Sequence, residues 1–391
     1  MGSTAVPRKM NRSSAMDRQL RVSLFWPTLA GGGVERVGLR IARELVARGY
    51  QVEIVLARAV GDLSNRVPQS VRLIELQVGL GLGRFALSVG PLKRYFQERP
   101  PDVFWSHMTE ANIVSLIAAQ YAGFKGWHIV SEHSTMSARI RRKLRKQILP
   151  IAARLLYPQA HRIHAVSTGV ADDLARSTGL DRNRIVVVPN PVVYPSIYHE
   201  AQEITDHPWF EPGQPPVVLG VGRLVAAKDF ATLIHAFDRV RKVLPARLLI
   251  LGEGPERVSL EALVHRMGLG DHVSMPGFVP NPYKYIKSAA VFVLSSQWEG
   301  LPSVLIEAMA IGTPVVSTDC PSGPREILEN GKWGTLVPVR DPQSLAEGII
   351  QTIKFPDVGR LEGAMERARE FSVERVMQEY IGKLFPTRNF R

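Results

Sequence analysis

The fold is decided by residues 20–57, LRVSLFWPTLAGGGVERVGLRIARELVARGYQVEIVLA. An apolar strand is expected over Leu20–Trp26, followed by a glycine turn, a helix over Val34–Gly49 and a second strand over Val52–Ala57. Strands that alternate with helices favour a parallel sheet with helices on both of its faces. This segment is therefore typical of an α/β protein.

The same alternation continues along the chain and divides it into two units. It is interrupted once, near the middle, by a proline-rich stretch without clear periodicity, and then resumes. Two α/β domains joined by a linker are therefore expected. The expected boundaries are a flexible basic tail at 1–19, an N-terminal domain at 20–190, a linker at 191–216, a C-terminal domain at 217–372 and a final segment at 373–391 that contains a helix.

The composition places the chain among ordinary globular proteins. Of its 391 residues, 45% are hydrophobic and 22% are charged, which excludes a disordered or fibrous chain. No apolar run approaches the roughly 18 residues of a membrane span, and the first residues lack the apolar core of a secretory signal. Cys320 is the single cysteine, so no intrachain disulfide can form. A cytoplasmic protein is expected.

The charge is unevenly distributed between the two halves. Residues 1–195 carry 28 Lys and Arg against 13 Asp and Glu, whereas residues 196–391 carry 21 against 23. Such an excess on one half indicates an anionic partner, either nucleic acid or an anionic membrane surface. No zinc-ligand spacing, RNA-recognition motif or aromatic platform supports nucleic acid, which is therefore not expected.

A basic cluster beside an apolar stripe favours the membrane. Residues 139–146 hold six cations in eight positions. The apolar side chains of one helical stripe are Ile140, Leu144, Ile148, Ile151 and Leu155. This combination suits peripheral docking on the inner face of a cytoplasmic membrane. The alternative is that the stripe packs on the core of the N-terminal domain.

Three local patterns are typical of phosphate or sugar binding. The glycine turn before residue 34 lets backbone N–H groups and the start of a helix approach an anion. Arg223 and Lys228 follow a strand and place two cations near its end. Glu299 and Glu307 flank Pro302, where a helix is expected to start, so that backbone amides lie beside both carboxylates.

Together with neighbouring motifs, these residues resemble a known family. In order, the chain contains Gly-Gly-Gly-Val-Glu-Arg at 31–36, Ser-Glu-His at 131–133, Val-Gly-Arg-Leu at 221–224, Gly-Glu-Gly-Pro at 252–255, Pro-Gly-Phe-Val at 276–279, Trp-Glu-Gly-Leu-Pro at 298–302 and Pro-Arg-Glu-Ile at 324–327. This series is similar to that of the retaining, metal-independent GT-B glycosyltransferases of family 4. The resemblance implies two Rossmann-like domains that face each other across a cleft, with the last helix returning to the N-terminal domain.

The resemblance also implies the roles of the reacting groups. Arg223 and Lys228 are expected to hold the diphosphate of the donor, and Glu299 to contact its sugar. His133 is expected beneath the donor sugar. No metal is expected, because the chain has no Asp-x-Asp motif and the two cations would stabilise the leaving group instead.

Further residues are expected to bind the nucleotide sugar. Glu307 is placed at the ribose hydroxyls and Glu253 near the base. The residues whose backbone is expected to line the donor site are Gly32, Gly33, Gly277, Phe278, Val279, Gly300 and Leu301.

The implied activity is transfer of a hexose or an N-acetylhexosamine from a nucleotide sugar, expected to be UDP-linked, to a glycan. The Asp-Cys-Pro-Ser-Gly-Pro stretch at 319–324 resembles members that extend polyprenyl-diphosphate-linked oligosaccharides. A soluble acceptor remains an alternative within the same fold. A nucleic-acid-binding protein is the alternative from another class.

Overall fold

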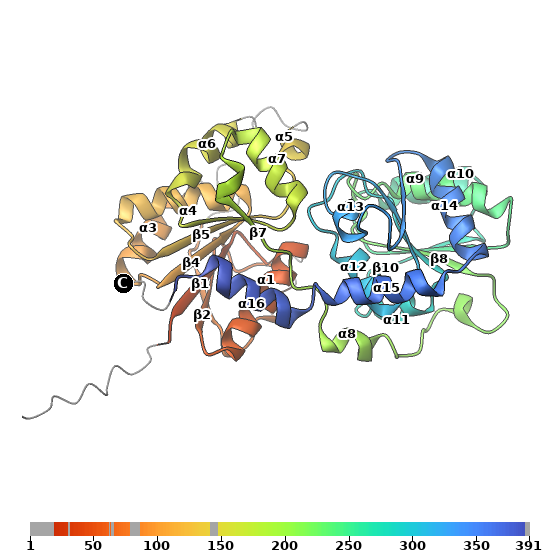
Figure 1. Ribbon diagram of the computed structural model, residues 1–391, viewed down its shortest axis with the longest axis horizontal. Helices are drawn as coiled ribbons and strands as arrows, with labels where there is room; N and C mark the ends of the chain where they lie inside the picture. Colours follow the sequence, from red (N-terminus) through yellow and green to blue (C-terminus); the bar gives the residue numbers. More distant parts are fainter. Residues whose placement is uncertain are drawn as a thin grey trace, which may run out of the picture.

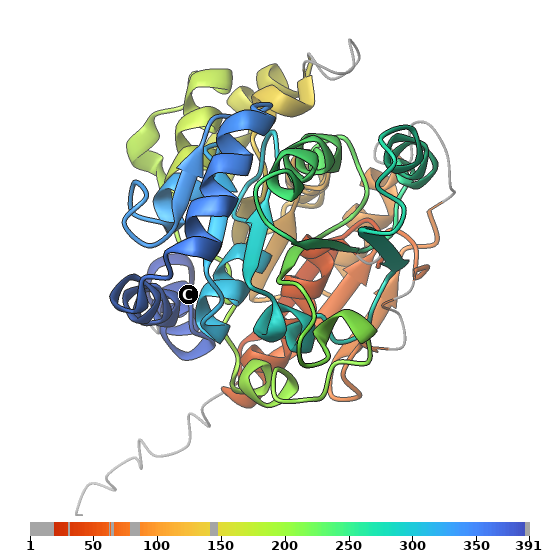
Figure 2. The same cartoon turned by 90° about the vertical axis from the view of Figure 1, so that its right-hand side faces the viewer.

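A computed structural model of the protein describes residues 19–29, 32–61, 63, 66–78, 87–140 and 148–387. Two α/β domains lie side by side, and the chain passes between them in the middle of the sequence and again close to its end (Figure 1). Figure 2 looks onto the C-terminal domain, with the N-terminal domain behind it.

The described part of the N-terminal domain forms a seven-stranded sheet in the order β3-β2-β1-β4-β5-β6-β7. All of its strand pairs are parallel, and most residues of its central strands are buried on both faces, as helices on both sides require. The strands are β1 (Arg21–Trp26), β2 (Gln51–Leu56), β3 (Arg72–Glu75), β4 (Val103–His107), β5 (Trp127–Glu132), β6 (Arg162–Ala165) and β7 (Ile185–Val187).

Helices connect these strands and cover the sheet. In the first helix, Val37, Ile41 and Leu45 recur at helical spacing and are buried in the same cluster as β1 and β2. The helices are α1 (Gly33–Ala47), α3 (Val89–Glu98), α4 (Thr109–Ala122), α5 (Met136–Ile140), α6 (Ile148–Leu156) and α7 (Thr168–Thr178).

The C-terminal domain repeats the plan with a six-stranded parallel sheet in the order β10-β9-β8-β11-β12-β13. Its strands are β8 (Val217–Val221), β9 (Arg247–Leu251), β10 (Val273–Gly277), β11 (Val291–Leu294), β12 (Val315–Thr318) and β13 (Thr335–Val337). Its helices are α9 (Phe230–Arg241), α10 (Arg257–Arg266), α11 (Tyr283–Ser288), α12 (Ser303–Ile311), α13 (Pro324–Ile327), α14 (Pro342–Lys354) and α15 (Val358–Arg369).

The last helix, α16 (Val373–Leu384), crosses back to the N-terminal domain (Figure 1). Tyr380 is fully buried there, with its ring 5.2 Å from that of Trp105 on β4. The Trp127 indole N–H donates to the carbonyl of Leu384 at 2.7 Å. The two-domain α/β fold with a returning helix, expected from the sequence, is therefore confirmed.

The segment between the domains is more structured than its prolines indicate. It contains α8 (Pro195–Glu200), which packs against α11 and α12 of the C-terminal domain, and a 3₁₀ turn over Pro208–Phe210. Helix α8 starts at Pro195, and proline is favoured in the first turn of a helix. The prolines of this segment are therefore compatible with a helix. Residues 191–216 are thus only partly the irregular linker that was expected.

Both sheets reverse their strand order at one point, which positions the functional loops. In the N-terminal sheet the reversal lies between β1 and β4, and in the C-terminal sheet between β8 and β11. Loops at the carboxyl ends of strands that flank such a point diverge and leave a crevice in which ligands bind. The glycine turn follows β1, and Arg223 follows β8.

Candidate functional site

The first feature of the site is an ion pair between the two C-terminal loops at the strand reversal. Lys228, in the loop after β8, donates from Nζ to Glu299 Oε1 in the loop after β11 at 2.7 Å. Ser296 Oγ donates to the same oxygen at 2.6 Å. An ammonium carries three protons, so Lys228 keeps donors for a ligand while Glu299 fixes its direction. The structure thus brings together two residues that are 71 positions apart.

Arg223 lies in the same loop as Lys228, after β8, and is exposed. Burial raises the pKa of the Glu35 carboxyl on α1 of the other domain, and the positive charge of the Arg223 guanidinium partly offsets this rise. Within the part of the chain that the structure describes, the Arg223 side chain makes no hydrogen bond or ion pair. A cation with this placement is available to an anionic ligand.

Glu307 is buried on α12, where its carboxyl faces the N-terminal domain. Its Oε1 accepts a hydrogen bond from the Tyr283 hydroxyl at 3.3 Å and lies 3.9 Å from Arg40 Nη1 of α1. Burial raises the pKa of Glu307, and the nearby charge of Arg40 opposes this rise. The sequence indicated Glu307 alone; its two partners come from other elements.

The loop that is expected to bind the base begins at a glycine with a positive φ. Gly277 ends β10 with φ at 99°, a conformation that favours glycine, and a Cβ there would lie 2.7 Å from Glu253 Oε1. Both oxygens of Glu253 accept hydrogen bonds from Arg257, which lower the pKa of the carboxyl. Phe278 follows, half exposed, with the Arg36 guanidinium of α1 5.7 Å from its ring centre. Phe278 therefore faces α1 across the boundary between the domains.

His133 lies after β5 and pairs with a second histidine. Its Nε2 is 3.0 Å from Nδ1 of His107, which ends β4. Burial, the largest influence, lowers the pKa of His133 to about 3, so the ring is neutral at physiological pH. A neutral imidazole can exchange hydrogen bonds with sugar hydroxyls without bringing a charge. His107 was not predicted from the sequence.

The two domains touch at the loop that follows β11. A Cβ on Gly300 would lie 2.0 Å from the backbone oxygen of His133, so only glycine permits this approach. The Gly300 carbonyl also accepts a hydrogen bond from Ser167 of the N-terminal domain at 2.9 Å. Leu301, next in sequence, is buried. His133 and Glu299 are thus held near one another, across the boundary between the domains.

The glycine turn enters the site at the start of α1. Gly32 caps the helix and Gly33 is its first residue, whereas Gly31 lies outside the described residues. The Glu35 carboxylate folds back over Gly32, where a Cβ would lie 2.4 Å from its Oε2. The turn therefore presents backbone N–H groups and one carboxylate to the cleft.

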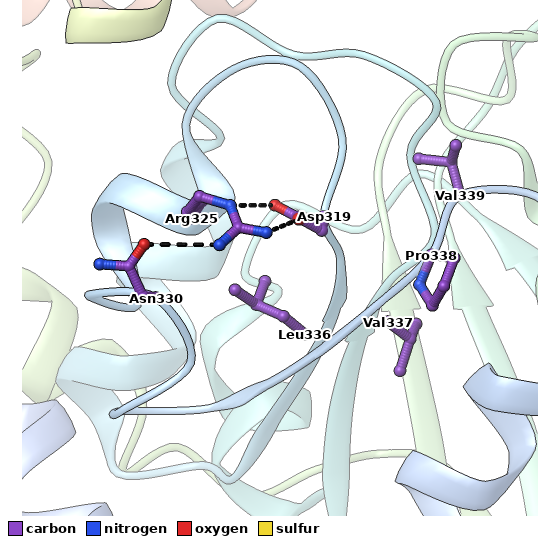
Figure 3. A pocket seen from close by; sticks show the side chains of 7 residues that line it. All are labelled: Asp319, Arg325, Asn330, Leu336, Val337, Pro338 and Val339. Carbon is purple, nitrogen blue, oxygen red and sulfur yellow. Dashed lines mark hydrogen bonds and ion pairs between the residues drawn. The ribbon is translucent and has the colours of Figure 1, made fainter.

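A surface hollow of the C-terminal domain lies at the ends of β12 and β13 (Figure 3). Arg325 crosses it and donates to both oxygens of Asp319 and to Asn330. The guanidinium is therefore occupied by side chains of its own domain. The loop after β13 also reaches the loop after β11, because Arg340 donates to Gln297 at 2.6 Å.

Comparisons with known proteins agree with this architecture. The model for glycosyl transferases group 1 matches residues 202–370, and that for glycosyltransferase family 4 matches residues 31–193. The solved structure of Anabaena HepE in complex with UDP and glucose has a TM-score of 0.76 at 21% identity, and covers 94% of this chain and 99% of that one. The fold is thus that of the GT-B glycosyltransferases, with two Rossmann-like domains.

Relatives in sequence lie in the same group. The chain is 29% identical to N-acetylgalactosamine-N,N'-diacetylbacillosaminyl-diphospho-undecaprenol 4-alpha-N-acetylgalactosaminyltransferase of Campylobacter jejuni, over 84% of this chain and 89% of that one. It is 34% identical to an uncharacterised glycosyltransferase of Methanocaldococcus jannaschii, but over 42% of this chain and only 48% of that one. The two family models together match most of the chain, which therefore belongs to glycosyltransferase family 4.

Proposed function

We propose that the protein transfers a hexose or an N-acetylhexosamine from a UDP-sugar to a glycan linked to polyprenyl diphosphate, with retention of the anomeric configuration. The name of the C. jejuni relative includes a diphospho-undecaprenol-linked acceptor, and HepE was solved with UDP. The observation that carries the proposal is the Lys228–Glu299 pair, with Arg223 beside it, at the strand reversal of the C-terminal sheet.

In the proposed reaction the two cations act on the leaving group. Negative charge grows on the diphosphate as the glycosidic bond breaks, so Lys228 and Arg223 interact more strongly with the transition state than with the bound donor. Backbone amides at the start of α12 add to this stabilisation. The leaving phosphate would take the proton of the attacking hydroxyl, and retention requires attack from the face that the diphosphate leaves.

The remaining residues orient the donor. Glu299 would accept hydrogen bonds from the sugar hydroxyls, and Glu307 from the ribose. His133 would contact the sugar from the N-terminal side as a neutral imidazole. Because the cations replace a metal, we expect turnover without a divalent cation. Loss of transfer in EDTA that Mn²⁺ restores would contradict this expectation.

A donor and acceptor screen tests the activity. UDP-GalNAc, UDP-GlcNAc, UDP-galactose and GDP-mannose would each be supplied with a short oligosaccharide on polyprenyl diphosphate. We expect transfer from one UDP-sugar, with an axial anomeric bond in the product by proton NMR. Transfer only to soluble sugars would favour the alternative acceptor, and an equatorial bond would exclude retention.

We also propose that the N-terminal domain docks on an anionic membrane. Ile148, Ile151 and Leu155 lie along α6 and are 65%, 61% and 67% exposed, so for these three residues the alternative of a core-packed stripe is wrong. The basic cluster at 139–146 precedes this helix, and its residues 141–146 lie outside the described residues. No described helix is long and apolar enough to cross a membrane. Peripheral contact would bring the active site to a lipid-linked acceptor.

Vesicle flotation tests the docking surface. Vesicles with anionic lipid should bind the protein, and Ile151→Ser with Leu155→Ser should release it while donor hydrolysis by water continues. Val258→Ser on α10 is a matched control, because this side chain is 78% exposed on the other domain. Equal binding of the double variant would exclude α6 as the anchor, and binding to RNA without lipid dependence would favour the nucleic-acid alternative.

A further inference from the structure

An arginine of the N-terminal domain reaches the carboxyl group that we assign to the ribose. Arg40 Nη2 donates to the Tyr283 hydroxyl at 3.3 Å, and its Nη1 lies 3.9 Å from Glu307 Oε1. Tyr283 in turn donates to the same Glu307 oxygen at 3.3 Å. Each of the three side chains thus contacts the other two, and together they join α1 of one domain to α11 and α12 of the other.

The position of Arg40 is fixed by its surroundings. Its neighbours Leu39 and Ile41 are buried in the core of the N-terminal domain, which holds α1 in place. The guanidinium lies 4.6 Å from the ring centre of Tyr194, at the start of α8, in a geometry that favours a cation–π interaction. Three separate parts of the chain therefore meet at Arg40, which is only partly exposed.

The charges around Glu307 make Arg40 the main cation of this set. Arg36 of α1 adds a weaker positive influence, and Glu200 of α8 adds a negative one. Tyr283 and Tyr194 are neutral, since burial raises the pKa of both phenols. Without Arg40, the buried carboxyl would face Glu200 with little compensation, and its protonated form would be favoured.

We propose that Arg40 is a positioning residue for nucleotide binding, which holds Glu307 ionised and directed at the ribose. This inference rests on the proposed ribose role of Glu307. A carboxylate accepts hydrogen bonds through both oxygens, whereas a protonated carboxyl loses acceptor capacity and presents a donor instead. Because Arg40 belongs to the N-terminal domain, the ribose site is complete only when the two domains are in register.

The test is the affinity for UDP of the full-length protein as a function of pH, measured by calorimetry. Arg40→Met should weaken UDP binding about tenfold, which corresponds to the loss of about 1.4 kcal/mol. The loss should be larger at pH 6 than at pH 8, because the removed charge opposed protonation of Glu307. In steady state the KM for the donor should rise while kcat stays the same, since the ribose contact is equal in ground and transition states.

Two further variants separate a specific role from a structural one. Arg40→Lys keeps the charge and should restore the pH profile, and it also serves if Arg40→Met fails to fold. In a Glu307→Gln background, Arg40→Met should cost little further affinity, because the two residues act as one unit. Arg43→Met, at an exposed arginine of the same helix, is the matched control and should change neither the affinity for UDP nor its pH dependence.

The outcomes distinguish the inference from the proposed function. Parallel pH profiles for Arg40→Met and the unchanged protein, or an equal loss in the Glu307→Gln background, would overturn the positioning role. If Glu307→Gln itself leaves the UDP affinity unchanged, the ribose assignment fails and the inference fails with it. If Glu307→Gln weakens UDP binding but Arg40→Met does not, the inference is wrong and the proposed ribose role of Glu307 stands.

Discussion

The two sheets present similar edges to the cleft but different chemistry. At the C-terminal edge, Lys228 and Glu299 form a partly buried ion pair, and Arg223 stands exposed beside it. At the N-terminal edge, the His107 ring stacks on two tryptophans. Its centre lies 4.9 Å from that of Trp26 and 5.0 Å from that of Trp105. One edge is therefore charged and the other is aromatic and neutral. The charged edge thus suits the anion site that we propose, whereas the neutral edge offers the partly exposed His133 beside a buried aromatic stack.

The largest effect is expected from removing the cation of the charged edge. Lys228→Ala should lower kcat about 10²- to 10³-fold, as does loss of a group that stabilises developing charge. Affinity for uridine, which lacks the diphosphate, should stay the same. Lys242→Ala is the matched control, because this lysine pairs with Asp238 on the surface. A kcat within threefold of the unchanged protein would show that the charged edge does not act on the leaving group.

The next effect concerns the contact between the two edges. Gly300→Ala places a methyl group against the His133 backbone and should lower the free energy of unfolding by about 1–3 kcal/mol, as overpacking does. Transfer from the donor should also slow, because the added methyl group forces the loop of Gly300 away from the loop of His133. Gly382→Ala, where a Cβ meets nothing within 4 Å, is the control and should stabilise α16. Equal urea midpoints for both variants would contradict the close approach.

The neutral edge should respond to acid. Burial lowers the pKa of His133 to about 3 and that of His164 to about 4, whereas both bind protons near pH 6.5 when unfolded. The unfolded state then binds more protons, so the contribution of these two histidines to stability is constant above about pH 7 and falls as pH drops through 6.5. Hydrogen exchange should show β4 and β5 losing protection at pH 5 before β8 and β11. His133→Gln should reduce the slope of this dependence, because one of the buried histidines is removed, and equal losses of protection in both sheets would contradict it.

The smallest expected effect tests which domain the last helix stabilises. Trp127→Phe removes the hydrogen bond to the Leu384 carbonyl and should lower the free energy of unfolding by about 0.5–1.5 kcal/mol. The loss should appear in exchange from the N-terminal sheet. Tyr121→Phe, at a side chain that is 70% exposed, is the control. Loss of protection confined to the C-terminal sheet would mean that α16 does not close the N-terminal domain.

The sequence predicts the elements of both domains because their signals are local. The two strands and the helix that are expected within residues 20–57 begin and end within two residues of their observed limits. Strand β3, however, is mostly exposed and lacks the apolar run that marks a strand. Helix α8 was missed because six prolines between residues 190 and 216 indicate a linker, although one of them starts the helix.

The partners in the site could not be predicted, because they are distant in the sequence. Glu307 belongs to a motif, but Arg40 is one of several arginines on α1, and only packing selects it over Arg43. His107 ends β4 and His133 follows β5, its neighbour in the sheet, so their pairing follows from strand order and not from spacing. Motifs thus indicate which residues act, and tertiary structure indicates which residues hold them in place.

The crossing of α16 has a consequence for synthesis on the ribosome. Trp127 and its partner Leu384 are 257 residues apart, and at roughly 5–20 residues per second the second follows the first by about 13–50 s. During that interval the nascent N-terminal domain exposes the apolar surface that Tyr380 later covers. A chaperone that shields this face until the last helix emerges would prevent the aggregation to which such nascent surfaces are prone.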